Sequence, residues 1–224
     1  MKQLGLVTIG QAPRSDLVPE IAPLLKGAEL VERGVLDDCT AAEIVQMQRE
    51  RKGQALATRL RDGSGVVIGE ADVVPRLMGK MVELEQEGVD AIALLCTGSF
   101  PDVPVKIPLL KAEPLLGQFV KAVGIGPIGV LTPDEAQRPF QQVRWEKLLC
   151  EPVKIAVANP YLSGAVDCVG KAAKELSEQG VQMIVLDCLG YSGAMRDKAR
   201  AEAGLPTALA RTVLARAAAE VLGL

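Results

Sequence analysis

The sequence predicts an α/β protein with two similar βα lobes, each built on a parallel sheet, related by a pseudo-two-fold. Residues 88–98 and 180–190 share Gly, Val, Ile, Leu, Cys and Gly at the same six positions. In both stretches a short apolar run stops at a cysteine, a pattern typical of a buried parallel strand. Residues 129–132 also repeat the pattern of residues 5–8. One supersecondary unit is therefore used twice.

Turn and capping residues delimit the elements of the first half. The apolar run before Gly10 predicts a buried strand, and Pro19 is compatible with the first turn of the next helix. Thr40 and Glu43 have the spacing of a capping box. Asp72 is the expected N-cap of the helix before the first cysteine strand. In chain order we expect strand 3–9, helix 17–25, strand 29–33, helix 40–51, hairpin strands 55–60 and 66–68, helix 72–87, the first cysteine strand, strand 105–107 and helix 114–123.

The second half continues the alternation of strands and helices. Ser192 can cap a helix that begins at Gly193, and the alanine-rich C-terminal segment has helical spacing. In chain order we expect strand 129–132, helix 133–148, strand 153–157, helix 162–179, the second cysteine strand, helix 193–203, strand 206–209 and helix 210–222.

The domain prediction follows from comparing the two halves. The first half is longer by about a helix and a hairpin, so a β-hairpin insertion at about 54–69 belongs to the first lobe. We assign residues 1–111 plus 205–224 to the first lobe and residues 112–204 to the second. An active-site cleft is expected between them, because ligands bind at the carboxyl ends of parallel strands.

Composition excludes several classes of function. The net charge is −3, and no basic run is interleaved with aromatic residues, which argues against nucleic acid as a partner. No apolar stretch is long enough to span a membrane, and the start of the chain lacks the pattern of a signal peptide. We therefore expect a cytoplasmic protein that has neither nucleic acid nor a membrane as a partner. A homodimer is the default assembly for such a fold.

The chain has five cysteines and no histidine. The cysteines are widely spaced and form no C-x-x-C pair, so neither a metal site nor a disulfide framework is expected. Residues 124–129 match G-x-G-x-x-G, but they follow a predicted helix and lead into a strand, which is the wrong context for a dinucleotide. No cofactor is predicted. Chemistry must depend on thiols, carboxylates, lysines, tyrosines or hydroxyls.

Cys96 and Cys188 are the candidate catalytic residues, because both lie at the carboxyl end of a predicted strand. Cys39, Cys150 and Cys168 are interpreted as packing residues. Backbone amides at the start of the helix capped by Ser192 would favour a thiolate, so we expect Cys188 to have the lower pKa. The other candidate contacts lie on loops at the same sheet edges: Thr8, Gln11, Arg14, Thr97, Gly98, Ser99, Thr132, Gly190, Tyr191 and Ser192.

Arg14 lies on the first βα loop, where its guanidinium could bind a carboxylate through two hydrogen bonds. Asp16, two positions further on, could orient it. A surface or interlobe salt bridge is the alternative for Arg14. Asp187 precedes Cys188, should point to the other face of the sheet, and is interpreted as a structural hydrogen-bond partner.

The opening TIGQAPRSD at residues 8–16, the two cysteine loops and the length resemble the AroM family, which is similar to the aspartate/glutamate/hydantoin racemase superfamily. This resemblance implies two βα lobes around a cofactor-independent site, in which two cysteines remove and return an α-proton on opposite faces of a carbanion. It also implies a small hydroxyl or amide residue after each cysteine. Thr97 matches that pattern. Leu189 departs from it, and Tyr191 or Ser192 could replace the missing donor.

The leading prediction is a cofactor-independent racemase- or epimerase-type isomerase that acts by two-cysteine proton transfer on a small carboxylate-bearing substrate. Three alternatives remain open. The first is a non-catalytic metabolite-binding or sensor protein on the same fold, which Leu189 favours. The second is a one-cysteine isomerase or decarboxylase. The third is a structural chain in which the cysteines only pack.

Overall fold

The computed structural model describes residues 1–224, and its strands form two four-stranded parallel sheets and one antiparallel hairpin. The first sheet has the order β2-β1-β5-β6, and the second has the order β8-β7-β9-β10 when read in the same direction. The strands of the first sheet are β1 (Lys2–Thr8), β2 (Ala28–Gly34), β5 (Ala91–Leu94) and β6 (Leu109–Lys111). Those of the second are β7 (Ile128–Thr132), β8 (Lys154–Val157), β9 (Met183–Leu186) and β10 (Thr207–Leu209). The α/β class and the repeated parallel sheet are confirmed.

Equivalent backbone hydrogen bonds fix the strand end before each cysteine. The amide of Leu95 donates to the carbonyl of Val7 at 2.8 Å, and the amide of Asp187 donates to the carbonyl of Leu131 at 3.0 Å. Both bonds join the cysteine strand to the strand that opens its half, β1 or β7. Each cysteine therefore leaves its sheet at the same point of the repeated topology.

The chain divides into two compact units, Met1–Ala112 with Leu214–Leu224, and Glu113–Val213. Our prediction returned the chain to the first lobe at residue 205, whereas the observed division falls inside α8 (Ala210–Leu222). The reason is that β10 pairs in parallel with β9, with Thr207 opposite Ile184, and so extends the second sheet. The short strand after residue 205 thus belongs to the second unit.

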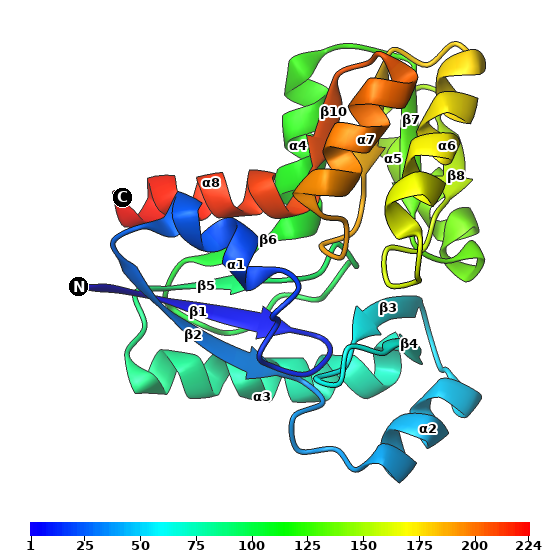
Figure 1. Ribbon diagram of the computed structural model, residues 1–224. Helices are drawn as coiled ribbons and strands as arrows, with labels where there is room; N and C mark the ends of the chain where they lie inside the picture. Colours follow the sequence, from blue (N-terminus) through cyan, green and yellow to red (C-terminus); the bar gives the residue numbers. More distant parts are fainter. The chain divides into compact units, whose positions relative to one another are not determined.

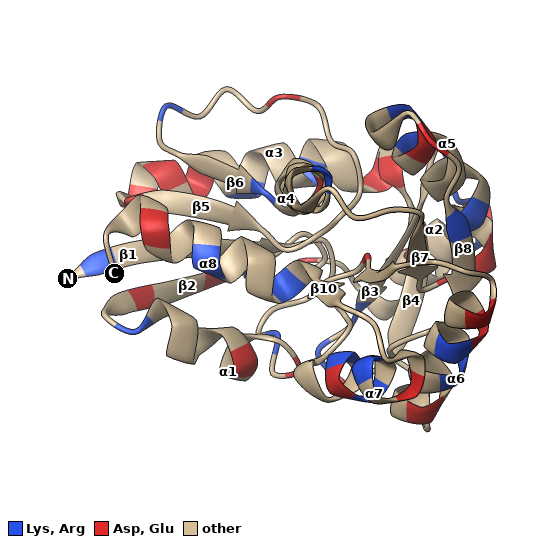
Figure 2. Cartoon of the chain, turned by 90° about the horizontal axis from the view of Figure 1, so that it is seen from above, with Lys and Arg blue, Asp and Glu red and all other residues tan.

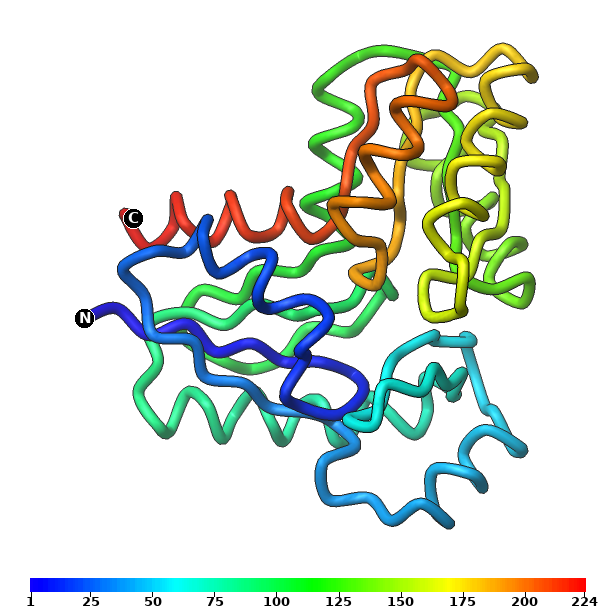
Figure 3. The backbone as a smooth tube through the Cα atoms, in the orientation of Figure 1, coloured from blue at the N-terminus to red at the C-terminus, as the bar shows by residue number.

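Helices cover both faces of the first sheet. Helix α3 (Glu70–Glu87) lies along one face, while α1 (Val18–Ile21) and α8 lie along the other (Figure 1). The contact with α3 is close, because a Cβ added at Gly5 of β1 would lie 2.8 Å from Leu84 Cδ1. The tube in Figure 3 begins at β1 and ends at α8, so both termini belong to this unit.

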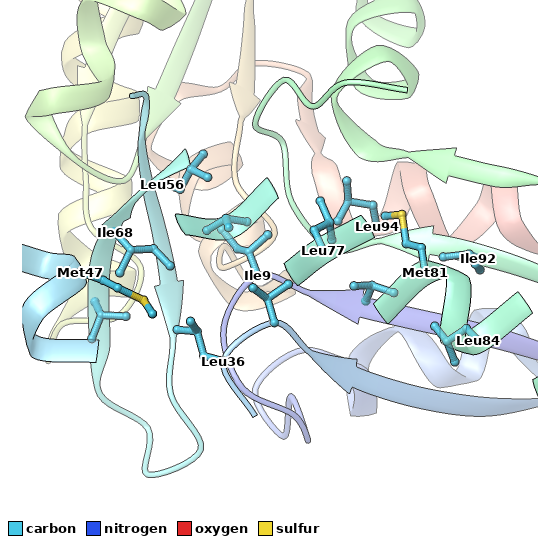
Figure 4. Packing of buried hydrophobic residues seen from close by; sticks show 14 of the residues in the cluster. Ile9, Leu36, Met47, Leu56, Ile68, Leu77, Met81, Leu84, Ile92 and Leu94 are labelled. Atoms are coloured by element: carbon cyan, nitrogen blue, oxygen red, sulfur yellow. The ribbon is translucent and has the colours of Figure 1, made fainter. Parts of the chain in front are cut away.

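The predicted hairpin insertion is confirmed. Strands β3 (Ala55–Arg59) and β4 (Gly65–Gly69) pair antiparallel, and α2 (Ala41–Glu50) packs against them. Leu56 and Ile68 are buried in the same apolar cluster as Ile9, which follows β1, Leu77 of α3 and Leu94 of β5 (Figure 4). The insertion is therefore part of the first unit's core.

The second unit has its own aliphatic core. Helices α6 (Ala165–Glu178) and α7 (Gly193–Ala203) pack together on one side of the sheet (Figure 2). On the other side lie α4 (Ala112–Val123) and α5 (Arg138–Leu149), where a Cβ added at Gly117 would lie 2.7 Å from Leu148 Cδ2. Lys and Arg alternate with Asp and Glu on the outer surfaces of α5, α6 and α7 (Figure 2). Short 3₁₀ turns, Ala22–Leu25 and Glu135–Gln137, complete the fold.

Two of the three predicted helix caps, Thr40 and Ser192, are confirmed, whereas the Asp72 cap and the strand 105–107 are wrong. Thr40 and Glu43 form the reciprocal capping box. Asp72 does not cap α3, because that helix begins at Glu70 after Gly69, which leaves Asp72 in the first turn. Residues 105–107 are not a strand. The Glu85 carboxylate accepts the amides of Lys106 at 2.5 Å and Ile107 at 3.3 Å, and the strand forms later, as β6.

No helix of the chain combines the length and apolar character that crossing a membrane requires.

Candidate functional site

The two cysteine loops have the same local geometry. The amide of Gly98 donates to the sulfur of Cys96 at 3.3 Å, and the amide of Gly190 donates to the sulfur of Cys188 at 3.3 Å. An N–H directed at sulfur favours the thiolate over the thiol. The repeated sequence pattern therefore produces, in each unit, a cysteine whose sulfur already has a backbone donor.

Both loops require glycine at Gly98 and Gly190, because neighbouring side chains occupy the space that a Cβ would need. A Cβ added at Gly190 would lie 2.5 Å from the hydroxyl oxygen of Tyr161, and one at Gly98 would lie 2.8 Å from Leu56 Cδ2. The two loops differ in burial, since Cys188 is buried and Cys96 is half-buried. Both loops are thus tightly packed by side chains of their own unit.

The residues after Cys96 keep the predicted positions on the loop. Thr97 is buried, Gly98 is buried, and Ser99 is half-buried. Among the cysteines interpreted as packing residues, Cys39 is half-buried against the first core. Cys150 and Cys168 are exposed, so the packing interpretation is wrong for these two.

Arg14 is held inside the first βα loop. Its Nε and Nη2 donate to the two carboxylate oxygens of Asp16, each at 2.8 Å, and its Nη1 donates to Thr8 Oγ1 at 2.9 Å. Only 2% of the Arg14 side chain is exposed. Burial would raise the pKa of Asp16, but the hydrogen bonds and charge of Arg14, with the charge of Arg59, hold it below its ordinary value. Asp16 orients Arg14 as expected, and the guanidinium supports the loop.

Thr8 and Gln11 also form bonds within the loop. Thr8 Oγ1 accepts the amide of Gly10 at 3.3 Å. The side-chain amide of Gln11 donates to the carbonyl of Leu36 at 3.1 Å, and its oxygen accepts the amide of Arg61 at 3.0 Å. These bonds attach the loop to the hairpin insertion and to the segment after β2.

Thr132 ends β7 as Thr8 ends β1. Its side chain is fully buried, and its hydroxyl donates to Gln137 Oε1 at 3.0 Å. Thr132 thus anchors the turn that follows β7, which is the role that Thr8 has after β1.

Tyr191 and Ser192 follow the Cys188 loop and have different environments. Tyr191 is completely buried, and its hydroxyl donates to the carbonyl of Ala158 at 2.8 Å. Burial, followed by the charges of Cys188, Asp187 and Tyr161, raises the pKa of Tyr191 well above its ordinary value. Tyr191 therefore acts as a neutral structural anchor. Ser192 is the N-cap of α7, as predicted, with its Oγ accepting the amide of Met195 at 3.2 Å.

Asp187 anchors the strand end before Cys188, as the sequence suggested. The indole N–H of Trp145 donates to its Oδ2 at 2.7 Å, and the guanidinium of Arg144 forms a very short ion pair with the same oxygen. Arg144 also lies 3.5 Å from the Glu113 carboxylate. Asp187 thus ties β9 to α5 directly beneath the loop.

Sequence reasoning missed two side chains at the Cys188 loop. The hydroxyl of Tyr161 lies 3.8 Å from the Cys188 sulfur. Arg211, in the first turn of α8, is fully buried and donates to the carbonyls of Leu189 and Gly190. Two signals were available: Tyr161 is one of only two tyrosines, and Arg211 is a charge within an apolar, alanine-rich helix.

No group of three or more Cys, Asp or Glu side chains has the geometry of a metal site. A hollow of about 390 Å³ in the first unit lies between the hairpin and α2. It is lined by Gln11, Cys39, Ala41, Ile44, Leu60, Arg61 and Asp62.

Solved structures with the same fold include proteins described as a decarboxylase and as racemases. A liganded variant of arylmalonate decarboxylase has a TM-score of 0.67 and 12% identity, covering 100% of this chain and 93% of its own. Allantoin racemase from Klebsiella pneumoniae has a TM-score of 0.64 and 11% identity, covering 100% and 89%. Aspartate racemase from Picrophilus torridus has a TM-score of 0.62 and 13% identity, covering 100% and 95%. At these identities the likeness shows the fold.

A comparison with curated protein sequences gives no match. The family model described as AroM protein matches residues 4–222, and the chain therefore belongs to the AroM family.

Proposed function

We propose that this protein is a cofactor-independent isomerase of the racemase or epimerase type, acting by two-cysteine proton transfer on a small carboxylate-bearing substrate. The observation that carries the proposal is the matched pair of cysteine loops, each with a glycine amide 3.3 Å from the sulfur. A buried structural cysteine needs no such donor, whereas a cysteine that must alternate between thiol and thiolate does.

In the proposed reaction one cysteine, as thiolate, removes the α-proton and becomes a thiol. The other cysteine, as thiol, gives its proton to the opposite face of the carbanion and becomes the thiolate. The substrate's configuration is inverted and no net proton is gained or lost. The reverse reaction exchanges the two roles, so Cys96 and Cys188 must both titrate within the working pH range.

The substrate carboxylate needs hydrogen-bond donors near the two sulfurs. Thr97, Ser99 and the loop amides supply them from the first unit. Ser192 supplies one from the second, since its oxygen accepts from Met195 and its own O–H remains a donor. Arg14 contributes through the loop that it stiffens, because its guanidinium is bound bidentately by Asp16. The proposal includes no metal and no cofactor.

One-cysteine chemistry, either isomerisation or decarboxylation, is the second candidate. It is favoured by the surroundings of Cys188, because this loop has Tyr161 beside the sulfur and Arg211 on its carbonyls. The fold also occurs in a protein described as arylmalonate decarboxylase. In this case only Cys188 would exchange a proton with the substrate.

The test is solvent-deuterium exchange. The protein is incubated in D₂O with each enantiomer of aspartate and with phenylmalonate, and deuterium at the α-carbon is followed by NMR. We expect exchange with inversion for a racemase and retained configuration or CO₂ release for one-cysteine chemistry. Cys168→Ala, which removes an exposed cysteine of α6, is the matched control and should leave exchange unchanged. Binding of a ligand without exchange would identify a sensor and contradict the proposal.

A further inference from the structure

Arg211 is a buried cation placed on the loop of Cys188. Only 1% of its surface is exposed. Its Nε and Nη2 donate to the carbonyl oxygen of Leu189 at 3.0 and 2.7 Å, and Nη2 also donates to the carbonyl of Gly190 at 3.0 Å. A buried guanidinium is expensive to desolvate, so its placement on two loop carbonyls indicates a specific role there.

One peptide unit connects this cation to the Cys188 sulfur. The carbonyl of Leu189 and the amide of Gly190 belong to the same peptide, which is trans and therefore directs the two groups in opposite directions. Arg211 binds the oxygen at one end, while the N–H at the other end donates to the Cys188 sulfur at 3.3 Å. A cation on the oxygen orients the peptide dipole and makes its N–H a stronger donor.

The first half of the chain has no cation at the matching position. The register of β6 on β5 and of β10 on β9 places Leu109 opposite Ile92 and Thr207 opposite Ile184. Leu109 and Thr207 are therefore equivalent positions of the repeat. Glu113 lies four positions after Leu109 and Arg211 lies four positions after Thr207, so these two residues correspond. The repeat therefore carries a positive side chain after β10 and a negative one after β6.

Several other titratable or charged groups lie near Cys188 in the second unit. Tyr161 places its hydroxyl 3.8 Å from the sulfur, and Tyr191 follows on the same loop. Asp187 precedes Cys188 and is paired with Arg144. The Gly190 amide favours a negative sulfur directly, and Arg211 acts on the peptide that carries this amide.

We propose that Arg211 is a positioning residue that stabilises the Cys188 thiolate through the Leu189–Gly190 peptide. The catalytic consequence of this assignment rests on the proposed function. The effect of Arg211 on the pKa of the Cys188 thiol does not rest on the proposed function, because it can be measured without a substrate.

The experiment is site-resolved alkylation. Iodoacetamide reacts with the thiolate, so the rate of modification of each cysteine is followed against pH by mass spectrometry of its peptide. In the wild-type protein we expect a lower pH midpoint for Cys188 than for Cys96. In Arg211→Met we expect the Cys188 midpoint to rise by about one pH unit, with the Cys96 midpoint unchanged. In Arg211→Lys, which keeps a charge but fewer donors, we expect a smaller rise.

Arg216→Met is the matched control, because Arg216 is exposed on the same helix and should leave both midpoints unchanged. Thermal unfolding of each variant identifies those that are folded at the assay temperature. A folded Arg211→Met or Arg211→Lys protein with an unchanged Cys188 midpoint would overturn the proposal and assign Arg211 a purely structural role. If neither variant folds, a wild-type midpoint for Cys188 equal to or above that of Cys96 overturns it. A shifted midpoint in a protein that exchanges no substrate would instead contradict the proposed function alone.

Discussion

Removal of the Arg14 guanidinium should destabilise the first unit strongly and in a pH-dependent way. Arg14→Met keeps most of the side-chain volume but removes the guanidinium that lies 2.8 Å from the Asp16 carboxylate, which is 12% exposed and keeps its ion pair with Arg59 at 3.9 Å. Breaking a buried, bidentate ion pair by removing one partner costs about 3–5 kcal/mol. The lower end, about 3 kcal/mol, is expected here because Arg59 keeps part of the interaction.

The pH dependence follows from the sign of the shift. The folded-state pKa of Asp16 lies below its ordinary value of 3.8, so the pair's contribution is present above about pH 4 and is lost as pH falls through the folded-state pKa. In Arg14→Met this pKa should rise, and the loss of stability on acidification that comes from Asp16 should shrink.

Urea unfolding at intervals from pH 7 to pH 3 measures both effects. Arg33→Met is the control, since the Arg33–Glu87 pair has 32% and 43% exposed side chains and should contribute less than about 1 kcal/mol. The reasoning is refuted if Arg14→Met loses no more free energy of unfolding than Arg33→Met at pH 7, or if its acid dependence equals that of the wild type.

Three further substitutions test the local structure. Tyr191→Phe leaves the carbonyl of Ala158 without its donor and should cost about 1–3 kcal/mol in denaturant unfolding. Because the pKa of Tyr191 is raised in the folded state, the wild type should also lose stability as pH rises above 10, and Tyr191→Phe should lose less; equal losses would exclude this residue as the cause. Thr40→Ala removes the capping box of α2 and should cost about 1 kcal/mol, with an unchanged urea midpoint as the contrary result. Gly10→Ala places a methyl group against the carbonyl of Arg59 and should cost about 1–3 kcal/mol; a wild-type melting temperature would show that the loop can move aside.

The features that the sequence predicted correctly depend on local signals. The cysteine strands were recognisable from a continuous apolar run that ends at Cys96 or Cys188. The start of α7 followed from Ser192, because a capping side chain and its target amide are only three residues apart. Such features are determined within one or two turns of chain.

The features that the sequence did not predict depend on contacts between distant residues. Arg211 binds a carbonyl 22 residues away, and Tyr161 reaches a sulfur 27 residues away. Nothing in the neighbourhood of either residue specifies its partner. The same reason explains the misplaced return of the chain, since the pairing of β10 with β9 is a tertiary contact. It also explains Tyr191, whose hydroxyl donates to the carbonyl of Ala158, 33 residues away, instead of being left for a substrate contact.

The central claim is that Cys96 and Cys188 act on opposite faces of one substrate carbon. Enantiomer-specific deuterium exchange in Cys96→Ala and Cys188→Ala, with the acid that the wild type inverts, tests it most directly. A single remaining cysteine can remove and return a proton on one face only. We predict that each variant loses inversion but still exchanges one enantiomer, and that the two variants exchange opposite enantiomers. Inversion that persists in either variant, or exchange of the same enantiomer by both, would contradict the two-cysteine mechanism.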